Sequence, residues 1–210
     1  MDSGRNTLAA RRGRQLIESR TGVNLEVLRA EQIAQFSELI APLGVQVYHA
    51  PSTAAAADIV REVAAELVLA EVLVSSELLG VFPDLEEGLI ERGLKPQLAS
   101  SPEGARDATL GLTTALNAIA ETGSVLMSEA SLADRSVAML SLTCMVLLPS
   151  SAMIPALEDA ARVLRAEARK PGGAYSTLVT GPSRTADIEL SLTVGVQGPG
   201  RMIVVFIDYA

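Results

Sequence analysis

Residues 181–189 have the composition of an anion-binding turn. This segment follows a stretch that reads as a strand, and Gly181 and Pro182 favour a tight turn there. Ser183 is placed to cap a short helix, whose free backbone N–H groups would bind an anion. Arg184 would add positive charge. The alternative is that Ser183 only caps the helix and that the acidic residues after it only complement the helix dipole.

Two carboxylates are the candidates for acid–base chemistry, Asp187 in that segment and Glu121 in a second one. The pattern predicts a helix that ends at Glu121-Thr122-Gly123, before a strand that begins at Ser124. A carboxylate at a helix C-terminus is unfavourable by about 0.3–1 kcal/mol, and local rules are often broken where a functional site requires it. We therefore predict Glu121 and Asp187 as catalytic residues, although Gly123 alone could account for the helix end.

Further polar and glycine positions complete the predicted site. Arg135 either binds an anionic ligand or forms a surface ion pair with Asp134 or Glu129. The loop at 195–200 holds three glycines and one proline, and Gln197 is its candidate for ligand recognition; the alternative is a tight hairpin or crossover. The predicted substrate-binding residues are Thr122, Gly123, Ser124, Arg135, Gly181, Pro182, Ser183, Arg184, Thr185, Glu189, Gln197 and Gly198.

Cysteine and histidine chemistry is restricted by number. Cys144 is the single cysteine and lies in an apolar run, where it behaves as a small hydrophobic residue. A lone cysteine cannot hold an iron–sulfur cluster or a zinc ion by thiolates, so no metal or cofactor is expected on this chain. His49 is the single histidine, and no supporting pattern for a catalytic triad surrounds it.

Composition limits the class of partner and the location. The net charge of −8 disfavours nucleic acid and anionic membranes as partners. Apolar runs are shorter than the roughly 18 residues that span a bilayer, and the N-terminus resembles no signal peptide, so we expect a cytoplasmic protein. With 49% apolar and 3% aromatic residues, the core must consist of Ala, Val, Leu and Ile.

These residues must be positioned by alternating strands and helices. Helices are predicted near 8–18, 25–43, 53–67, 84–92, 112–119 and 154–164, with Asn24 and Ser52 or Thr53 as N-caps and Pro155 in a first turn. Strands are predicted near 45–47, 68–74, 108–112, 124–127, 142–148, 176–180 and 202–207, and a loop at 97–107. Several strands are apolar on both faces, which predicts a mostly parallel sheet with helices on both sides.

The expected organisation is a helical segment at 1–43 followed by an α/β domain at 44–210. Ligands of parallel sheets bind beyond the carboxyl ends of the strands. We therefore expect the turns around Glu121 and Ser183 to meet over one edge of the sheet and to form one polar pocket.

The motifs together resemble a known family. The run 181–189, followed by Gly-Val-Gln-Gly-Pro at 195–199, resembles the C-terminal signature of the LUD (lactate utilisation) domain, as in LutC or YkgG-type proteins. Residues 119–124, Ile-Ala-Glu-Thr-Gly-Ser, resemble its central motif. Two departures are clear: the family usually has His at the position of Gln197, and Ser141-Leu142-Thr143 stands where many members have Leu-Pro and a nearby His. Gln cannot serve as a general acid or base.

The resemblance implies a three-layer αβα sandwich of the NagB/RpiA/CoA-transferase-like type. It also implies a non-redox component of a system that oxidises L-lactate to pyruvate, working with an iron–sulfur subunit and a further subunit. The chain would bind a small carboxylate or phosphate, or assemble with these partners. The alternative is a free-standing isomerase or CoA-transferase-like enzyme, with Glu121 as base or nucleophile and the 181–185 turn holding a phosphate or carboxylate.

Overall fold

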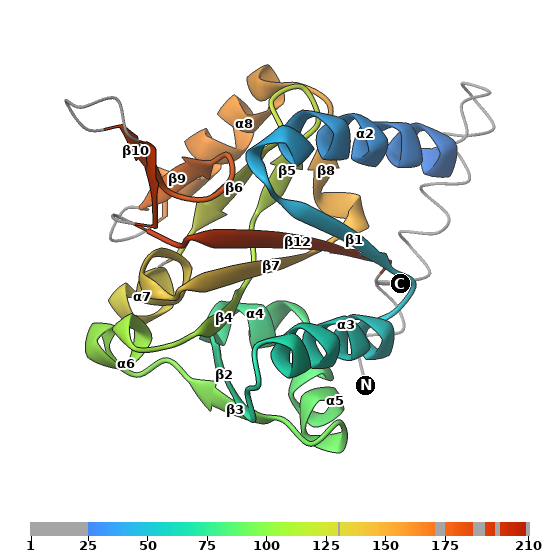
Figure 1. The fold of residues 1–210 in the computed structure, drawn as a ribbon. Helices are drawn as coiled ribbons and strands as arrows, with labels where there is room; N and C mark the ends of the chain where they lie inside the picture. The colour runs from blue at the N-terminus through green and yellow to red at the C-terminus, as the bar shows by residue number, and fades with distance from the viewer. Residues whose placement is uncertain (1–24, 130, 171–174, 187–191, 196–197, 209–210) are drawn as a thin grey trace.

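A six-stranded sheet in which every neighbouring pair is parallel runs through the centre of the molecule (Figure 1). The structure is a computed structural model that describes residues 25–129, 131–170, 175–186, 192–195 and 198–208. The strand order is β1-β12-β7-β4-β2-β3. Their bounds are β1 Gln46–Ala50, β2 Glu71–Val74, β3 Lys95–Leu98, β4 Leu110–Thr113, β7 Thr143–Pro149 and β12 Arg201–Ile207.

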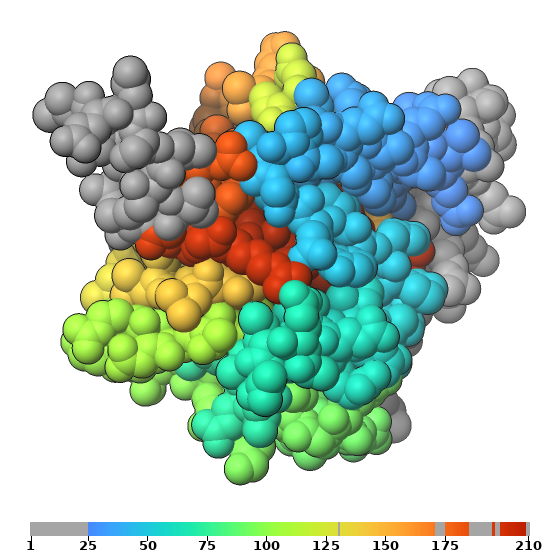
Figure 2. All heavy atoms as spheres, in the orientation of Figure 1, coloured from blue at the N-terminus to red at the C-terminus, as the bar shows by residue number. Residues whose placement is uncertain are grey.

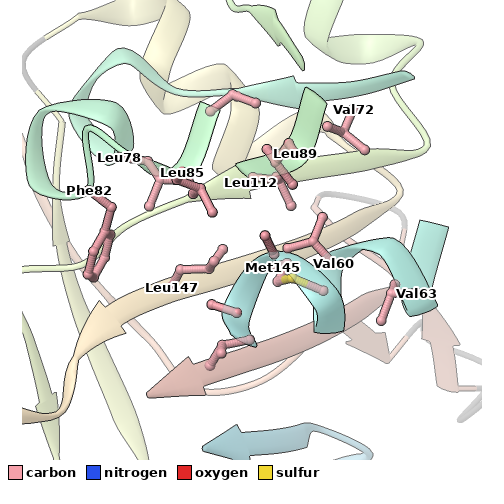
Figure 3. Close-up of a cluster of buried hydrophobic side chains, with 14 of the residues drawn as sticks. Val60, Val63, Val72, Leu78, Phe82, Leu85, Leu89, Leu112, Met145 and Leu147 are labelled. Atoms are coloured by element: carbon pink, nitrogen blue, oxygen red, sulfur yellow. The ribbon is translucent and has the colours of Figure 1, made fainter. Parts of the chain in front are cut away.

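Helices α3 (Thr53–Glu66), α4 (Ser76–Val81) and α5 (Leu85–Glu91) cover one face of this sheet. The side chain of Ser52 accepts a hydrogen bond from the N–H of Ala55, so it caps α3 as predicted. Val60 of α3 and aliphatic side chains of α5 pack with inward-facing strand residues in a fully apolar cluster (Figure 3). The burial of these side chains is the main favourable contribution to the stability of this half of the molecule.

The opposite face is covered by α2 (Leu25–Ile40) and by a second sheet. That sheet has the order β8-β5-β6-β9 and combines parallel and antiparallel pairs. Its strands are β5 Asn117–Ile119, β6 Ser124–Ser128, β8 Met153–Ile154 and β9 Ser176–Val179. Phe36 of α2 meets Phe206 of β12 edge to face, with ring centroids 5.4 Å apart. Helix α8 (Leu157–Glu167) packs on the outer side of the second sheet through Ala160.

The remaining elements lie at one end of the central sheet. They are α6 (Pro102–Arg106), α7 (Leu132–Leu140), the antiparallel pair β10 (Arg184–Ala186) and β11 (Leu192–Val194), and a short 3₁₀ turn at Ala41–Leu43. A second 3₁₀ turn, Ser150–Ala152, follows β7 at the opposite end of the sheet. α7 approaches β4 so closely that a Cβ atom at Gly111 would lie 2.9 Å from the carbonyl oxygen of Val137. The contact of α7 with β4 therefore depends on a residue without a side chain.

The predicted fold class is confirmed: the molecule is an α/β protein with a mostly parallel sheet and helices on both of its faces. β7 and β12 are buried along nearly their whole length, as the two-sided apolar pattern predicted. The four-stranded sheet was not predicted. Its strands β6 and β9 were predicted as separate strands, whereas β5 and β8 are only three and two residues long and carry little periodic information. Among the described residues, no helix is both long enough and apolar enough to cross a membrane.

Three predictions of local structure are wrong. The helix at 112–119 is replaced by the end of β4 and by β5, because backbone pairing with β6 overrides an apolar spacing only eight residues long. The helix after Ser183 is replaced by β10, since the Ser183 N–H donates to the carbonyl of Pro199 and its own carbonyl accepts from Gly195. The predicted loop at 97–107 contains the end of β3 and α6.

The N-terminal elements of the prediction are only partly described. The helix at 25–43 is confirmed as α2 with its terminal 3₁₀ turn, whereas the helix at 8–18 and the Asn24 cap lie outside the described residues.

The start of α8 also differs from the prediction. Pro155 does not lie in the first turn of α8, because the helix begins at Leu157 after Ala156 as N-cap.

Candidate functional site

A pocket of about 340 Å³ lies between the two sheets, where the central strands begin. β6 and β9 form one wall, the first residues of β7 and β12 form the floor, and α7 closes one side. Most of its lining is apolar or glycine: Met127, Ala138, Met139, Cys144, Val179, Gly181, Gly198, Pro199 and Met202. The polar lining consists of Glu129, Tyr175, Thr177, Ser183 and Arg184. An apolar cavity with few polar groups is the usual form of a small-molecule site.

The pocket lies at the amino ends of β7 and β12, not at the carboxyl ends. Cys144 and Met202 on its floor are each the second residue of their strand. The expectation that the ligand site lies beyond the carboxyl ends is therefore wrong for this pocket. The pocket lies at the amino ends because β6 and β9 of the second sheet form its wall beside the first residues of β7 and β12. Figure 2 shows the red residues of β12 between the blue residues of α2 and the yellow residues of α7.

The two C-terminal segments singled out in the sequence lie against each other here. Hydrogen bonds join Ser183 to Pro199 and Gly195, at 2.9 and 3.0 Å. The two segments approach closely at Gly198, where an added Cβ atom would lie 3.2 Å from Cβ of Ser183. Gly181 has φ +85°, which only glycine adopts easily, and turns the chain from β9 toward the pocket.

Arg184 stands at the exposed rim of the pocket. Its guanidinium donates a hydrogen bond of 2.6 Å to the carbonyl oxygen of Leu43, the residue that ends the N-terminal helical region. This bond holds the guanidinium in place beside the cavity. A guanidinium held in this way is well suited to bind a carboxylate through two parallel hydrogen bonds.

Glu121 lies outside the pocket. Its carboxylate accepts a hydrogen bond of 2.8 Å from the N–H of Leu157, the first residue of α8. The premise behind its catalytic prediction is wrong, because Glu121 follows β5 in a turn between two strands and ends no helix. Instead, its charge faces the N-terminus of α8, which is the favourable end of a helix dipole.

The other residues of the central motif connect the two predicted turns without entering the pocket. Thr122 donates to the Ser124 hydroxyl at 2.9 Å, and this hydroxyl lies 2.6 Å from that of Thr180, next to Gly181. Gly123 makes the turn with φ +63°. The two turns are thus neighbours, as predicted, but only the second of them lines the cavity.

Arg135 of α7 stacks on the ring of Tyr175, 4.6 Å from its centroid, and so supports a pocket wall from behind. Neighbouring Asp134 accepts hydrogen bonds from the Ser76 N–H and hydroxyl, both at 2.6 Å, and from the Ser131 hydroxyl at 2.8 Å. This network joins the starts of α4 and α7. Arg135 contributes to the site through Tyr175.

Of the other predicted site residues, Pro182 is half-buried in the turn outside the lining. Thr185 belongs to β10, and its side chain is not described. Asp187, Glu189 and Gln197 lie outside the described residues.

The prominent polar residue that sequence reasoning missed is Glu129, which follows β6. Glu129 is only 4% exposed, and its Oε1 has no hydrogen-bond partner among the described residues. Burial, and next the negative charge of Glu77, raise the pKa of the Glu129 carboxyl to about 7. The signal in the sequence was a charged residue directly after a short strand whose three central residues, Val125, Leu126 and Met127, are apolar.

Cys144 is buried on the pocket floor, as its apolar run predicted, and His49 lies away from the pocket. Cys144 is buried, and burial raises the pKa of its thiol to about 12, so it remains a neutral thiol. His49 lies at the end of β1, away from the pocket, 3.0 Å from the carboxylate of Asp208. Within the described parts of the chain, His, Cys, Asp and Glu side chains form no group of three that could hold a metal ion.

Comparisons with known proteins identify the family. The model of the LUD domain matches residues 33–207, which is most of the chain. The chain belongs to the LUD domain family. A LUD domain accordingly includes both sheets, the pocket and the last turns of α2.

Relatives of this LUD domain include proteins called lactate utilization protein C. That of Bacillus velezensis is 32% identical over 114 residues, covering 53% of this chain and 47% of the relative. Those of Anoxybacillus flavithermus and Bacillus subtilis are 34% and 31% identical over 105 and 106 residues, each covering 50% of this chain and 46% and 44% of the relative. The matched part thus spans about half the length of these relatives.

A solved structure shares the fold of this LUD domain. The crystal structure of a DUF162 family protein from Deinococcus radiodurans superimposes with a TM-score of 0.62 at 19% identity, covering 85% of this chain and 98% of that one. This similarity concerns the fold alone.

Proposed function

We propose that this LUD domain protein is the non-redox component of a cytoplasmic system that oxidises L-lactate to pyruvate, and that it binds a small carboxylate. The lactate link comes from the relatives that carry the name lactate utilization protein C. The observation that carries the binding role is the position of Arg184 at the rim of the pocket, held by Leu43.

The size and lining of the pocket favour a small organic acid. About 340 Å³ is at the lower end of the range for ligand sites, roughly 300–1,000 Å³. The guanidinium of Arg184 would bind the carboxylate, and Met127 and Met202 would contact a short carbon chain.

The redox step belongs to partner subunits in this proposal. Cys144 is the single cysteine of the sequence and is buried, so this chain lacks the four thiolates that usually hold an iron–sulfur cluster. The partners that the family resemblance implies are an iron–sulfur subunit and a further subunit. The alternative isomerase or CoA-transferase activity required Glu121 beside the 181–185 turn, and its carboxylate instead binds the start of α8.

Calorimetric titration of the purified chain with L-lactate, pyruvate and inorganic phosphate tests the binding role. We expect the two carboxylates to bind, and Arg184→Ala to weaken binding by roughly 10- to 100-fold, the usual effect of losing a charged hydrogen bond. Arg162→Ala, which removes an arginine that is 83% exposed on α8, is the matched control and should bind normally. Binding of phosphate alone, or equal affinity in the Arg184→Ala variant, would contradict the proposal.

Anaerobic purification of this chain from its native host tests whether it works together with an iron–sulfur subunit in lactate oxidation. An iron–sulfur protein is expected to purify with this chain, and a deletion strain is expected to lose growth on L-lactate. Normal growth of that strain, together with purification of the chain alone, would argue against the proposed system.

A further inference from the structure

Glu129 is a buried carboxyl group that faces the pocket and has no role in the fold we describe. It follows β6, it is 4% exposed, and its Oε1 has no hydrogen-bond partner among the described residues. A buried acceptor without a partner is costly, typically by more than a formed hydrogen bond contributes. A ligand that supplies a donor to this oxygen would remove that cost.

The groups around Glu129 do not neutralise it. Two of them are acidic, Glu77 from α4 and Asp134 from α7. Arg135 attracts Glu129, but its guanidinium stacks on Tyr175. The neighbouring thiol of Cys144 stays neutral. The carboxyl thus exists in both protonation states near neutral pH, because burial raises its pKa to about 7.

We propose that Glu129 determines which carboxylic acids this pocket accepts: its carboxylate accepts a hydrogen bond from the hydroxyl of a 2-hydroxy acid, whose own carboxylate binds Arg184. This inference rests on the proposed function, since it requires a small carboxylate in the pocket. Both side chains line the same cavity, one between the sheets and one at the rim. A 2-hydroxy acid carries the two complementary groups, a carboxylate for Arg184 and a hydroxyl donor for Glu129.

The same geometry makes recognition depend on the oxidation state of the ligand. A hydroxyl group donates to the ionised form of Glu129 or accepts from its protonated form, so a 2-hydroxy acid can pair with either form. The oxo group of a 2-oxo acid only accepts, so it pairs with the protonated form and is bound with uptake of a proton. The carboxylate of either acid and Arg184 keep their charges over the neutral range. The affinity for the 2-hydroxy acid relative to that for the 2-oxo acid must therefore rise with pH.

Titration calorimetry with L-lactate and pyruvate at about pH 6 and about pH 8 tests this inference. With a Glu129 pKa of about 7, the ionised fraction rises about tenfold between these values. We expect the affinity for lactate relative to that for pyruvate to rise up to about tenfold between the two pH values, because pyruvate loses its hydrogen bond when Glu129 ionises. Buffers of different ionisation enthalpy should show more proton uptake with pyruvate than with lactate.

Two variants assign the effect to Glu129. Glu129→Gln keeps the shape and should remove the pH dependence of the relative affinity while carboxylate binding remains. Glu77→Gln removes a negative charge beside Glu129 and should move the midpoint of that change to lower pH. The wild-type profiles alone remain decisive if a variant does not fold.

A relative affinity for the two acids that does not change with pH, or a change that persists in Glu129→Gln, would overturn the role of Glu129 and leave the proposed carboxylate binding intact. Absence of binding by both acids at both pH values would overturn this inference and the binding part of the proposed function together.

Discussion

At the scale of the residue, Glu121 and Glu129 have the same side chain in different surroundings. Glu121 is exposed and accepts a hydrogen bond from the first N–H of α8, which is a stabilising position for a negative charge. Glu129 is buried beside Glu77 and Asp134, which destabilises its ionised form. Perturbed carboxyl groups in cavities are the usual candidates for functional residues, and Glu129, unlike Glu121, lines the pocket.

The raised pKa of Glu129 predicts how stability changes with pH. The folded protein holds this proton up to about pH 7, whereas the unfolded chain releases it near the usual value of 4.5. The free energy of unfolding should therefore fall as pH rises through this window, by about 3 kcal/mol in total from this group. Urea unfolding of Glu129→Gln across the window should lack that contribution, so the variant should be the more stable protein above neutral pH.

Glu62→Gln is the control for that measurement, since Glu62 is exposed on α3. It should keep the wild-type dependence on pH. Parallel stability curves for Glu129→Gln and the wild type would show that Glu129 does not titrate in the folded protein as described.

At the scale of the element, the second sheet and α7 decide where the pocket lies. β6 and β9 supply one wall, and α7 approaches β4 closely enough to close the side. If residues 112–119 formed the predicted helix, β5 would be absent and β6 would lose one of its two pairing partners. The position of the cavity therefore follows from strand pairing between segments that are far apart in sequence.

Gly111→Ala should test the contact between α7 and β4. The added methyl group would lie 2.9 Å from the Val137 carbonyl and would also overlap the side chain of Ser141. We expect a loss of about 1–3 kcal/mol in the free energy of unfolding, as for other overpacked sites. Gly104→Ala in α6 is the matched control, because a Cβ atom there meets nothing within 4 Å, and it should be neutral or slightly stabilising. Equal stability of the two variants would mean that α7 can move away without cost.

At the scale of the whole molecule, α2 shares its core with the α/β domain. Phe36 and Ile40 are fully buried in the cluster that also contains Phe206 of the central sheet. The LUD family match begins at residue 33, within α2. The boundary between residues 43 and 44 stays a prediction, but the packing of α2 favours a single cooperative unit.

Phe36→Ala is expected to show this dependence. Removing a buried aromatic ring typically costs about 3–5 kcal/mol, and the loss should appear in one unfolding transition of the entire molecule. Leu28→Ala on the same helix is the control, since Leu28 is 40% exposed and its loss should cost at most about 1 kcal/mol. A separate early transition in Phe36→Ala, with the remaining fold unchanged in stability, would show that α2 is an independent attachment.

The sequence by itself determined the fold class and the segments that could form a site. The two-sided apolar pattern of β7 and β12 requires helices or a sheet over both faces, and Gly181 requires a turn, because such requirements act within a few residues. Only the tertiary structure decided that Ser183 begins no helix and that Glu121 lies outside the pocket. The Ser183 N–H donates to the carbonyl of Pro199, and the Glu121 carboxylate accepts from the N–H of Leu157. Both partners lie outside the local segment, so the local sequence does not predict these contacts. The raised pKa of Glu129 likewise follows from tertiary structure, because the pKa of a carboxyl group depends on its burial and on the neighbours that folding brings together.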